Sequence, residues 1–76
     1  MPAITTFQVV DCNRELERLG LAARVRLHDA CGRQTLGLEV ADDTARARAQ
    51  TAVSSFFESA RVPVEFSDDG RTFWAR

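Results

Sequence analysis

Two runs in the first half of the chain alternate between apolar and polar positions. In residues 24–28 valine and leucine alternate with arginine and histidine, and in residues 35–40 leucine and valine alternate with polar residues and glycine. A period of two gives each run one apolar and one polar side, as in strands that lie on a core. Gly32 stands between the runs, where a tight turn usually needs a positive φ. The pattern predicts an antiparallel hairpin.

A helical period precedes this hairpin. One apolar stripe recurs at helical spacing through Val9, Cys12, Leu16 and Leu19. Thr5 and Gln8 fit a capping box, with Ile4 placed to form a hydrophobic staple with the start of the stripe. Gly20 stands where a helix C′ glycine belongs. These signals predict a long helix between its Thr5 cap and Gly20.

A rival interpretation makes residues 4–10 a strand and lets Asp11 cap a shorter helix. The long helix is favoured because its cap, its stripe and its terminator agree.

A second helical stripe follows the hairpin, with small residues early and two phenylalanines late. Its members are Ala45, Ala49, Ala52, Val53, Phe56, Phe57 and Ala60. Asp42 or Asp43 can cap this helix and place negative charge at its positive end. Pro63 pushes the residue before it toward extended geometry, so we expect the helix to end near Ala60.

The last segment repeats the hairpin plan. Residues 62–67 alternate again between apolar and other residues, residues 68–70 (Asp-Asp-Gly) form a turn, and residues 72–75 form the returning strand. The order is therefore helix, hairpin, helix, hairpin.

This order predicts a single α+β domain over residues 1–76 with an αββαββ plan. Both helices would cover one face of a four-stranded antiparallel sheet, because each element then buries its apolar side in two layers. The plan is that of a circularly permuted ferredoxin-like fold. That analogy places the first and third strands outside and the second and fourth inside, and Pro63 then falls on an edge strand, where a proline is tolerated.

Composition narrows the class of protein. The chain is 45% hydrophobic and 28% charged with a net charge of −1, as in an ordinary globular protein without a field that attracts nucleic acid. No apolar run is long enough to span a membrane, and the N-terminus lacks the pattern of a signal peptide. We expect a cytoplasmic protein with reduced cysteines, no membrane contact and a core small enough to gain from a partner subunit.

The sheet face away from the helices is expected to stay open. Its side chains would be Arg24, Arg26 and His28 on one strand, Thr35 and Glu39 on the next, and Glu65 on the far edge. Phe73 and Trp74 are neighbours on a strand, so they point to opposite sides, and one of the two aromatics joins this face. An exposed aromatic among charges indicates an interface. The alternative is that this ring only folds onto neighbouring side chains near the chain end.

One short motif resembles a known family. Asp29-Ala30-Cys31-Gly32 followed by Gln34, with residues 64–67 and Phe73-Trp74 near the end, resembles the RDAC family of small bacterial proteins, which is named for an Arg-Asp-Ala-Cys motif. The resemblance runs from Leu19 onward, and His28 stands where the family name has arginine. It implies an alignment of elements and no catalytic residues.

The hairpin corner is where chemistry could occur. Arg33 and His28 near Cys31 favour the reactive thiolate, whereas Asp29 opposes it. His28 and Cys31 together with Cys12 suggest zinc ligands. However, Cys12 belongs to the stripe that faces the core, and His28 points to the other side of the sheet. We therefore expect no metal or other cofactor within one chain, whereas a site shared across a dimer stays open. For Cys31 alone, the favoured interpretation is a small side chain that closes the turn.

The favoured hypothesis is a non-enzymatic module that binds another protein or a second copy of itself through the open sheet face. The candidate binding residues are Arg24, Arg26, His28, Cys31, Arg33, Phe73 and Trp74. One alternative is a thiol-reactive or metal-binding protein that uses Cys31 and His28. Another is a single-strand nucleic-acid binder that stacks bases on the sheet, which the acidic residues of the same face disfavour.

Overall fold

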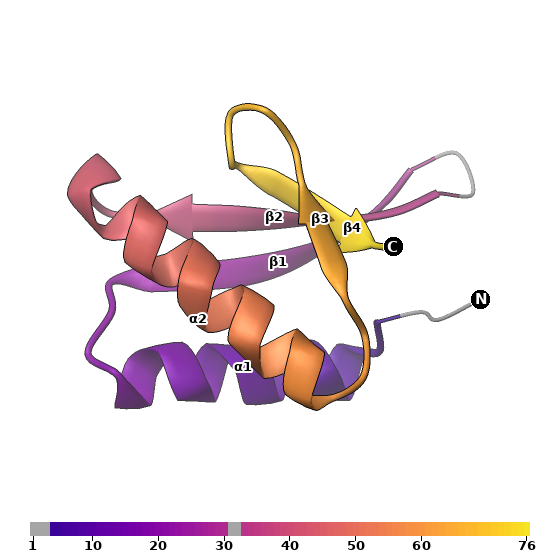
Figure 1. Cartoon of the computed structure of the whole chain (residues 1–76), viewed down its shortest axis with the longest axis horizontal. Helices are drawn as coiled ribbons and strands as arrows, with labels where there is room; N and C mark the ends of the chain where they lie inside the picture. Colours follow the sequence, from indigo (N-terminus) through magenta and orange to yellow (C-terminus); the bar gives the residue numbers. More distant parts are fainter. Residues whose placement is uncertain (1–3, 31–32) are drawn as a thin grey trace.

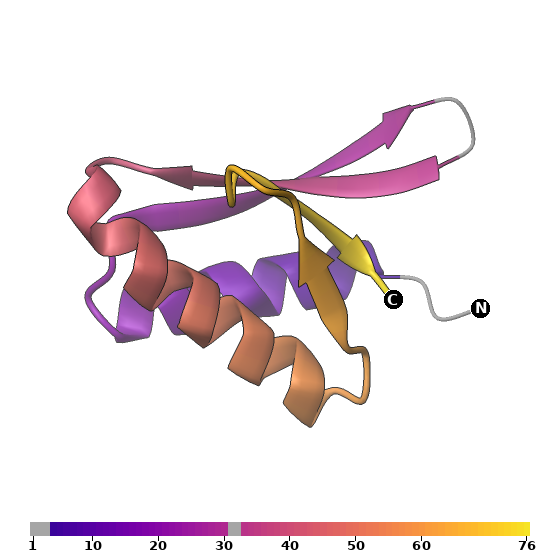
Figure 2. The same cartoon turned by 45° about the horizontal axis from the view of Figure 1, so that its top comes forward.

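The computed structural model describes residues 4–30 and 33–76 and contains two helices and a four-stranded antiparallel sheet (Figure 1). The elements are α1 (Thr6–Arg18), β1 (Ala23–Ala30), β2 (Arg33–Val40), a 3-10 turn (Asp43–Ala45), α2 (Arg46–Ser59), β3 (Val64–Phe66) and β4 (Thr72–Ala75). Both helices lie on one face of the sheet, and no described element covers the other face (Figure 2). The predicted α+β class is confirmed.

The strand order is β1-β2-β4-β3, so β1 and β3 are the outer strands. Val25 pairs with Leu38 across the first hairpin, and Leu36 pairs with Phe73 between β2 and β4. These pairs put the apolar rows on the side of the helices. Pro63 directly precedes the outer strand β3. The relation to a permuted ferredoxin-like fold stays a prediction.

Helix α1 begins and ends as the sequence predicts. Oγ1 of Thr5 accepts a hydrogen bond from the Gln8 amide at 3.2 Å, and the Gln8 side chain accepts one from the Thr5 amide at 2.9 Å. At the other end Gly20 has φ 74°, and the amide of Leu21 bonds the carbonyl of Leu16 at 3.0 Å. This is a capping box followed by a Schellman motif, so the helix interpretation of residues 4–10 is confirmed over the strand.

Helix α2 begins differently from the prediction. Asp42 caps the short 3-10 turn by accepting from the Thr44 amide at 2.9 Å, whereas α2 itself starts at Arg46 without a side-chain cap. Helix α2 ends at Ser59 with Ala60 as its C-cap, near the end that the sequence predicts. There Arg61 takes the left-handed position with φ 62°.

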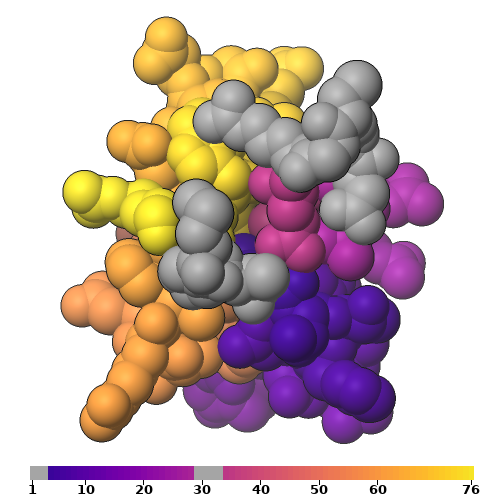
Figure 3. All heavy atoms as spheres, turned by 90° about the vertical axis from the view of Figure 1, so that its right-hand side faces the viewer, coloured from indigo at the N-terminus to yellow at the C-terminus, as the bar shows by residue number. Residues whose placement is uncertain are grey.

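The core lies between the sheet and the helices. Its buried residues are Ile4, Val9, Cys12, Leu16, Val25, Leu36, Leu38, Ala49, Val53, Phe57, Val62 and Phe73. Seen from the right-hand side of Figure 1, α1 (indigo) and the end of α2 (orange) form the lower part and the strands (magenta and yellow) the upper part (Figure 3). The rings of Phe57 and Phe73, 5.9 Å apart, join the two layers.

Two side-chain amides tie backbone segments to the fold. Asn13 on α1 donates to the Val25 carbonyl at 3.0 Å and accepts from the Val25 amide at 2.7 Å. Gln34 makes the same pair of bonds with the backbone of Ile4, at 2.7 and 2.9 Å. Asn13 therefore satisfies part of the outer edge of β1, and an edge protected in this way is a poorer template for an incoming strand.

Among the described residues, no helix has both the length and the apolar character that crossing a membrane requires.

Candidate functional site: the open sheet face

The open face is formed by the side chains that alternate with the buried rows of the strands. We define it as Arg24, Arg26, His28, Thr35, Gly37, Glu39, Glu65, Thr72 and Trp74. It therefore contains the charged positions predicted from the alternation, and it adds Gly37 and Thr72.

The two neighbouring aromatics divide between the faces. Phe73 is completely buried and contacts the ring of Phe66, with the ring centres 5.1 Å apart. Trp74 is half-buried on the open face, where its indole Nε1 donates to Oε2 of Glu65 at 3.0 Å. Glu65 is also its cross-strand partner. Of the two candidates, only Trp74 lies where a partner on this face can reach it, because Phe73 fills the core.

Charges are arranged in rows across the face. Arg24, Arg26 and His28 follow one another on β1 and are all exposed. Nη1 of Arg26 lies 3.2 Å from Oε1 of Glu39, and their side chains are 62% and 58% exposed. A pair so exposed contributes about 0–1 kcal/mol. It therefore adds little to the stability of the fold.

The imidazole of His28 covers a glycine in the middle of the sheet. Gly37 is buried on the central strand β2, and a Cβ atom there would lie 3.1 Å from Nε2 of His28. Beside His28 begins a shallow groove of about 560 Å³ whose walls include Arg71 and Thr72. At this position the face has no side chain of its own, and the imidazole of His28 covers the backbone of Gly37.

The corner chemistry lies mostly outside the described residues. Cys31 belongs to the part that is not described, and Arg33 is placed by its backbone alone, opposite Ala30. Cys12 is buried in the core as predicted. Its burial, reinforced by the nearby Glu15 carboxylate, raises the pKa of its thiol to about 12. A thiol with so high a pKa stays protonated and unreactive at neutral pH.

Metal binding has no support in the described residues. Cys12 lies under the helix layer and His28 lies on the opposite face of the sheet, so the two do not converge. Within residues 4–30 and 33–76, no group of three His, Cys, Asp or Glu side chains could hold a metal ion.

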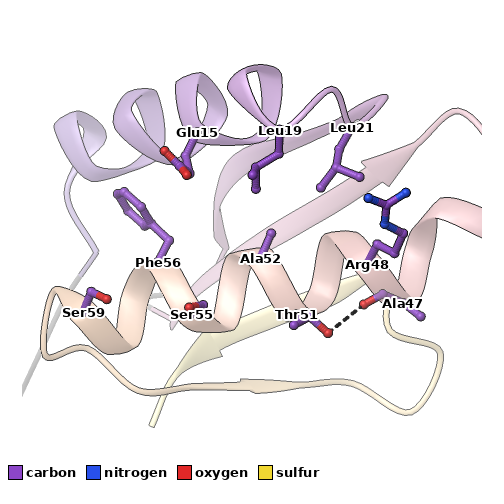
Figure 4. Close-up of a pocket in the computed structure, with 10 residues that line it drawn as sticks. All are labelled: Glu15, Leu19, Leu21, Ala47, Arg48, Thr51, Ala52, Ser55, Phe56 and Ser59. Atoms are coloured by element: carbon purple, nitrogen blue, oxygen red, sulfur yellow. Dashed lines mark hydrogen bonds between the residues drawn. The ribbon is translucent and has the colours of Figure 1, made fainter.

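A second surface was missed by the sequence analysis. A groove of about 700 Å³ runs between α1 and α2, with Leu19 after α1 on one wall and Ala52 and Phe56 of α2 on the other (Figure 4). Leu19 is 43% exposed. In the sequence, the adjacent phenylalanines of α2 indicate this groove. Side chains about 100° apart on a helix cannot both point at the centre of the core, so one of the two must lie toward its edge.

The chain was compared with protein-family models, with curated proteins and with solved structures, and none of the three comparisons gives a match.

Proposed function

We propose that this protein is a non-enzymatic interaction module that binds another polypeptide through its open face. The observation that carries the proposal is the placement of Trp74. It is the only tryptophan of the chain, it lies on a face that no described element covers, and Glu65 orients its indole. Tryptophan and arginine are the residues in which binding energy at protein interfaces concentrates.

The mixture of charges on the face supports a polypeptide partner. Arg24 and Arg26 share it with Glu39 and Glu65. A polyanion such as single-stranded nucleic acid would meet these carboxylates, and its binding draws mainly on positive charge. A protein surface with both signs of charge can pair with both sets of residues.

The test compares two aromatic truncations on opposite sides of the molecule. Trp74→Ala alters the open face, and Phe7→Ala alters α1, where Phe7 is 82% exposed. Each variant is immobilised, exposed to cell extract, and checked for folding by far-UV circular dichroism. We expect Trp74→Ala to weaken partner capture at least tenfold, or about 1.4 kcal/mol, and Phe7→Ala to leave it unchanged.

A variant in the groove between the helices tests whether the partner binds there instead of on the open face. If Leu19→Glu abolishes capture while folded Trp74→Ala retains it, the binding surface is the helix layer and the proposal is wrong.

A further inference from the structure

The open face is electrically asymmetric across the sheet. The half formed by β1 and β2 carries the guanidinium groups of Arg24 and Arg26 against the single carboxylate of Glu39. The half formed by β4 and β3 carries Glu65 beside Trp74, and its arginines, Arg71 and Arg76, lie outside β4 at its two ends. A face with opposite charge at its two sides favours neither a purely acidic nor a purely basic partner.

Such a face is complementary to itself after a half turn. When two sheets stack face to face around a two-fold axis parallel to their strands, the order β1-β2-β4-β3 places β1 of each copy over β3 of the other. The cationic row then lies over the partner copy's acidic strand, and the contact occurs twice.

We propose that the partner of the open face is a second copy of this chain, stacked in this way; the inference rests on the proposed function. His28 pairs with Thr35, and Leu36 pairs with Phe73, so His28 and Trp74 lie at about the same level along the strands. Arg26 and His28 of one copy therefore lie over the strand that carries Glu65 in the other, and Trp74, on β4, lies over β2 next to them.

The size of the face sets the strength of this dimer. The face carries the nine positions defined above, fewer than the roughly 20–30 residues that each partner contributes to a standard interface. We expect a reversible dimer in the micromolar range that weakens as salt screens the exposed charges.

The experiment uses two charge reversals. Arg26→Glu and Glu65→Arg each bring like charges together twice in a homodimer, so each variant alone should be monomeric. Mixed in equal amounts, they should dimerise with an affinity near that of the wild type, because both contacts then join opposite charges. Sedimentation equilibrium of each chain and of the mixture measures this. The control is Arg14→Glu, an exposed charge reversal on α1, which should leave dimerisation unchanged.

Three results would overturn the inference. They are a wild-type chain that stays monomeric up to millimolar concentration, folded single variants that dimerise as well as the wild type, and a mixture that does not dimerise. A monomeric wild type that still captures another protein in a Trp74-dependent manner overturns the second-copy inference and leaves the proposed function standing. Association that neither Trp74→Ala nor the charge reversals change overturns both.

Discussion

The imidazole of His28 on β1 lies over Gly37 on β2: a methyl group added at Gly37 would approach Nε2 to 3.1 Å. A glycine inside a strand costs about 0.5–1 kcal/mol relative to alanine, so its presence under a ring on a central strand has a cost in stability. The imidazole of His28 therefore covers a strand position that has no side chain of its own.

This contact predicts a coupling between the two positions. In a His28→Ala background, Gly37→Ala should stabilise the fold by about 0.5–1 kcal/mol, because the space above the strand is then open. In the wild type the imidazole must move, and the gain should shrink or vanish. A double-mutant cycle by urea unfolding measures the difference. Equal effects in both backgrounds would show that the ring and the glycine are independent.

Removing the glycine after α1 and introducing one after α2 should change the stability of the fold in opposite directions. Gly20 and Arg61 occupy the same left-handed position after α1 and α2, with φ 74° and 62°. Gly20→Ala should destabilise by about 1–2 kcal/mol through the backbone alone, since a Cβ there meets no atom within 4 Å. Arg61→Gly should stabilise by up to about 1 kcal/mol, as relief of the backbone outweighs the added entropy of the unfolded chain. Thermal unfolding of both variants checks the signs, and a loss of stability in Arg61→Gly would contradict the account.

The bond pair between Asn13 and Val25 predicts a local effect on the outer strand. Asn13→Leu removes both hydrogen bonds and should cost about 1–3 kcal/mol. It should also speed hydrogen exchange of the Val25 amide more than that of amides elsewhere in β1. Arg14→Leu, at the next position of the same helix, is the control and should leave Val25 unaffected. Unchanged exchange in Asn13→Leu would mean that the amide does not protect this edge.

The buried Cys12 thiol predicts a loss of stability at high pH. Its folded pKa of about 12 lies above the ordinary value of 9.0, so the thiol is neutral in both states only well below pH 9. Between the two values the unfolded chain loses this proton and the folded chain keeps it, so stability falls by up to about 1.4 kcal/mol per pH unit. The chain has no lysine or tyrosine to titrate in the same window.

Cys12→Ala should flatten this slope in urea unfolding between pH 9 and 11, whereas Cys31→Ser should keep it. A slope that persists in Cys12→Ala would assign the pH dependence to another group.

Patterns within short stretches of the sequence predict most of the helices and strands. The cap at Thr5, the stripe after it and Gly20 lie within one stretch of chain, so the sequence alone predicts this helix. Alternation likewise separated Phe73 from Trp74. It could not say which of the two faces the core, because that depends on the pairing of Leu36 with Phe73 between strands distant in the sequence.

Three features of the structure are not predicted by the periodic pattern of the sequence. The bonds of Asn13 to Val25 join residues through side-chain geometry that leaves no periodic pattern. The start of α2 moved to Arg46 because Asp42 caps a 3-10 turn first. The groove beside Leu19 arises from how two helices diverge, which no single stripe encodes.

Fluorescence of Trp74 tests the role of the open face most directly. As the only tryptophan in a chain without tyrosine, it makes the emission report on this face alone. If the open face is the binding surface, association should shift the emission to shorter wavelength and reduce quenching by acrylamide, because the indole leaves water. Association detected by sedimentation with unchanged emission and unchanged quenching would contradict the account.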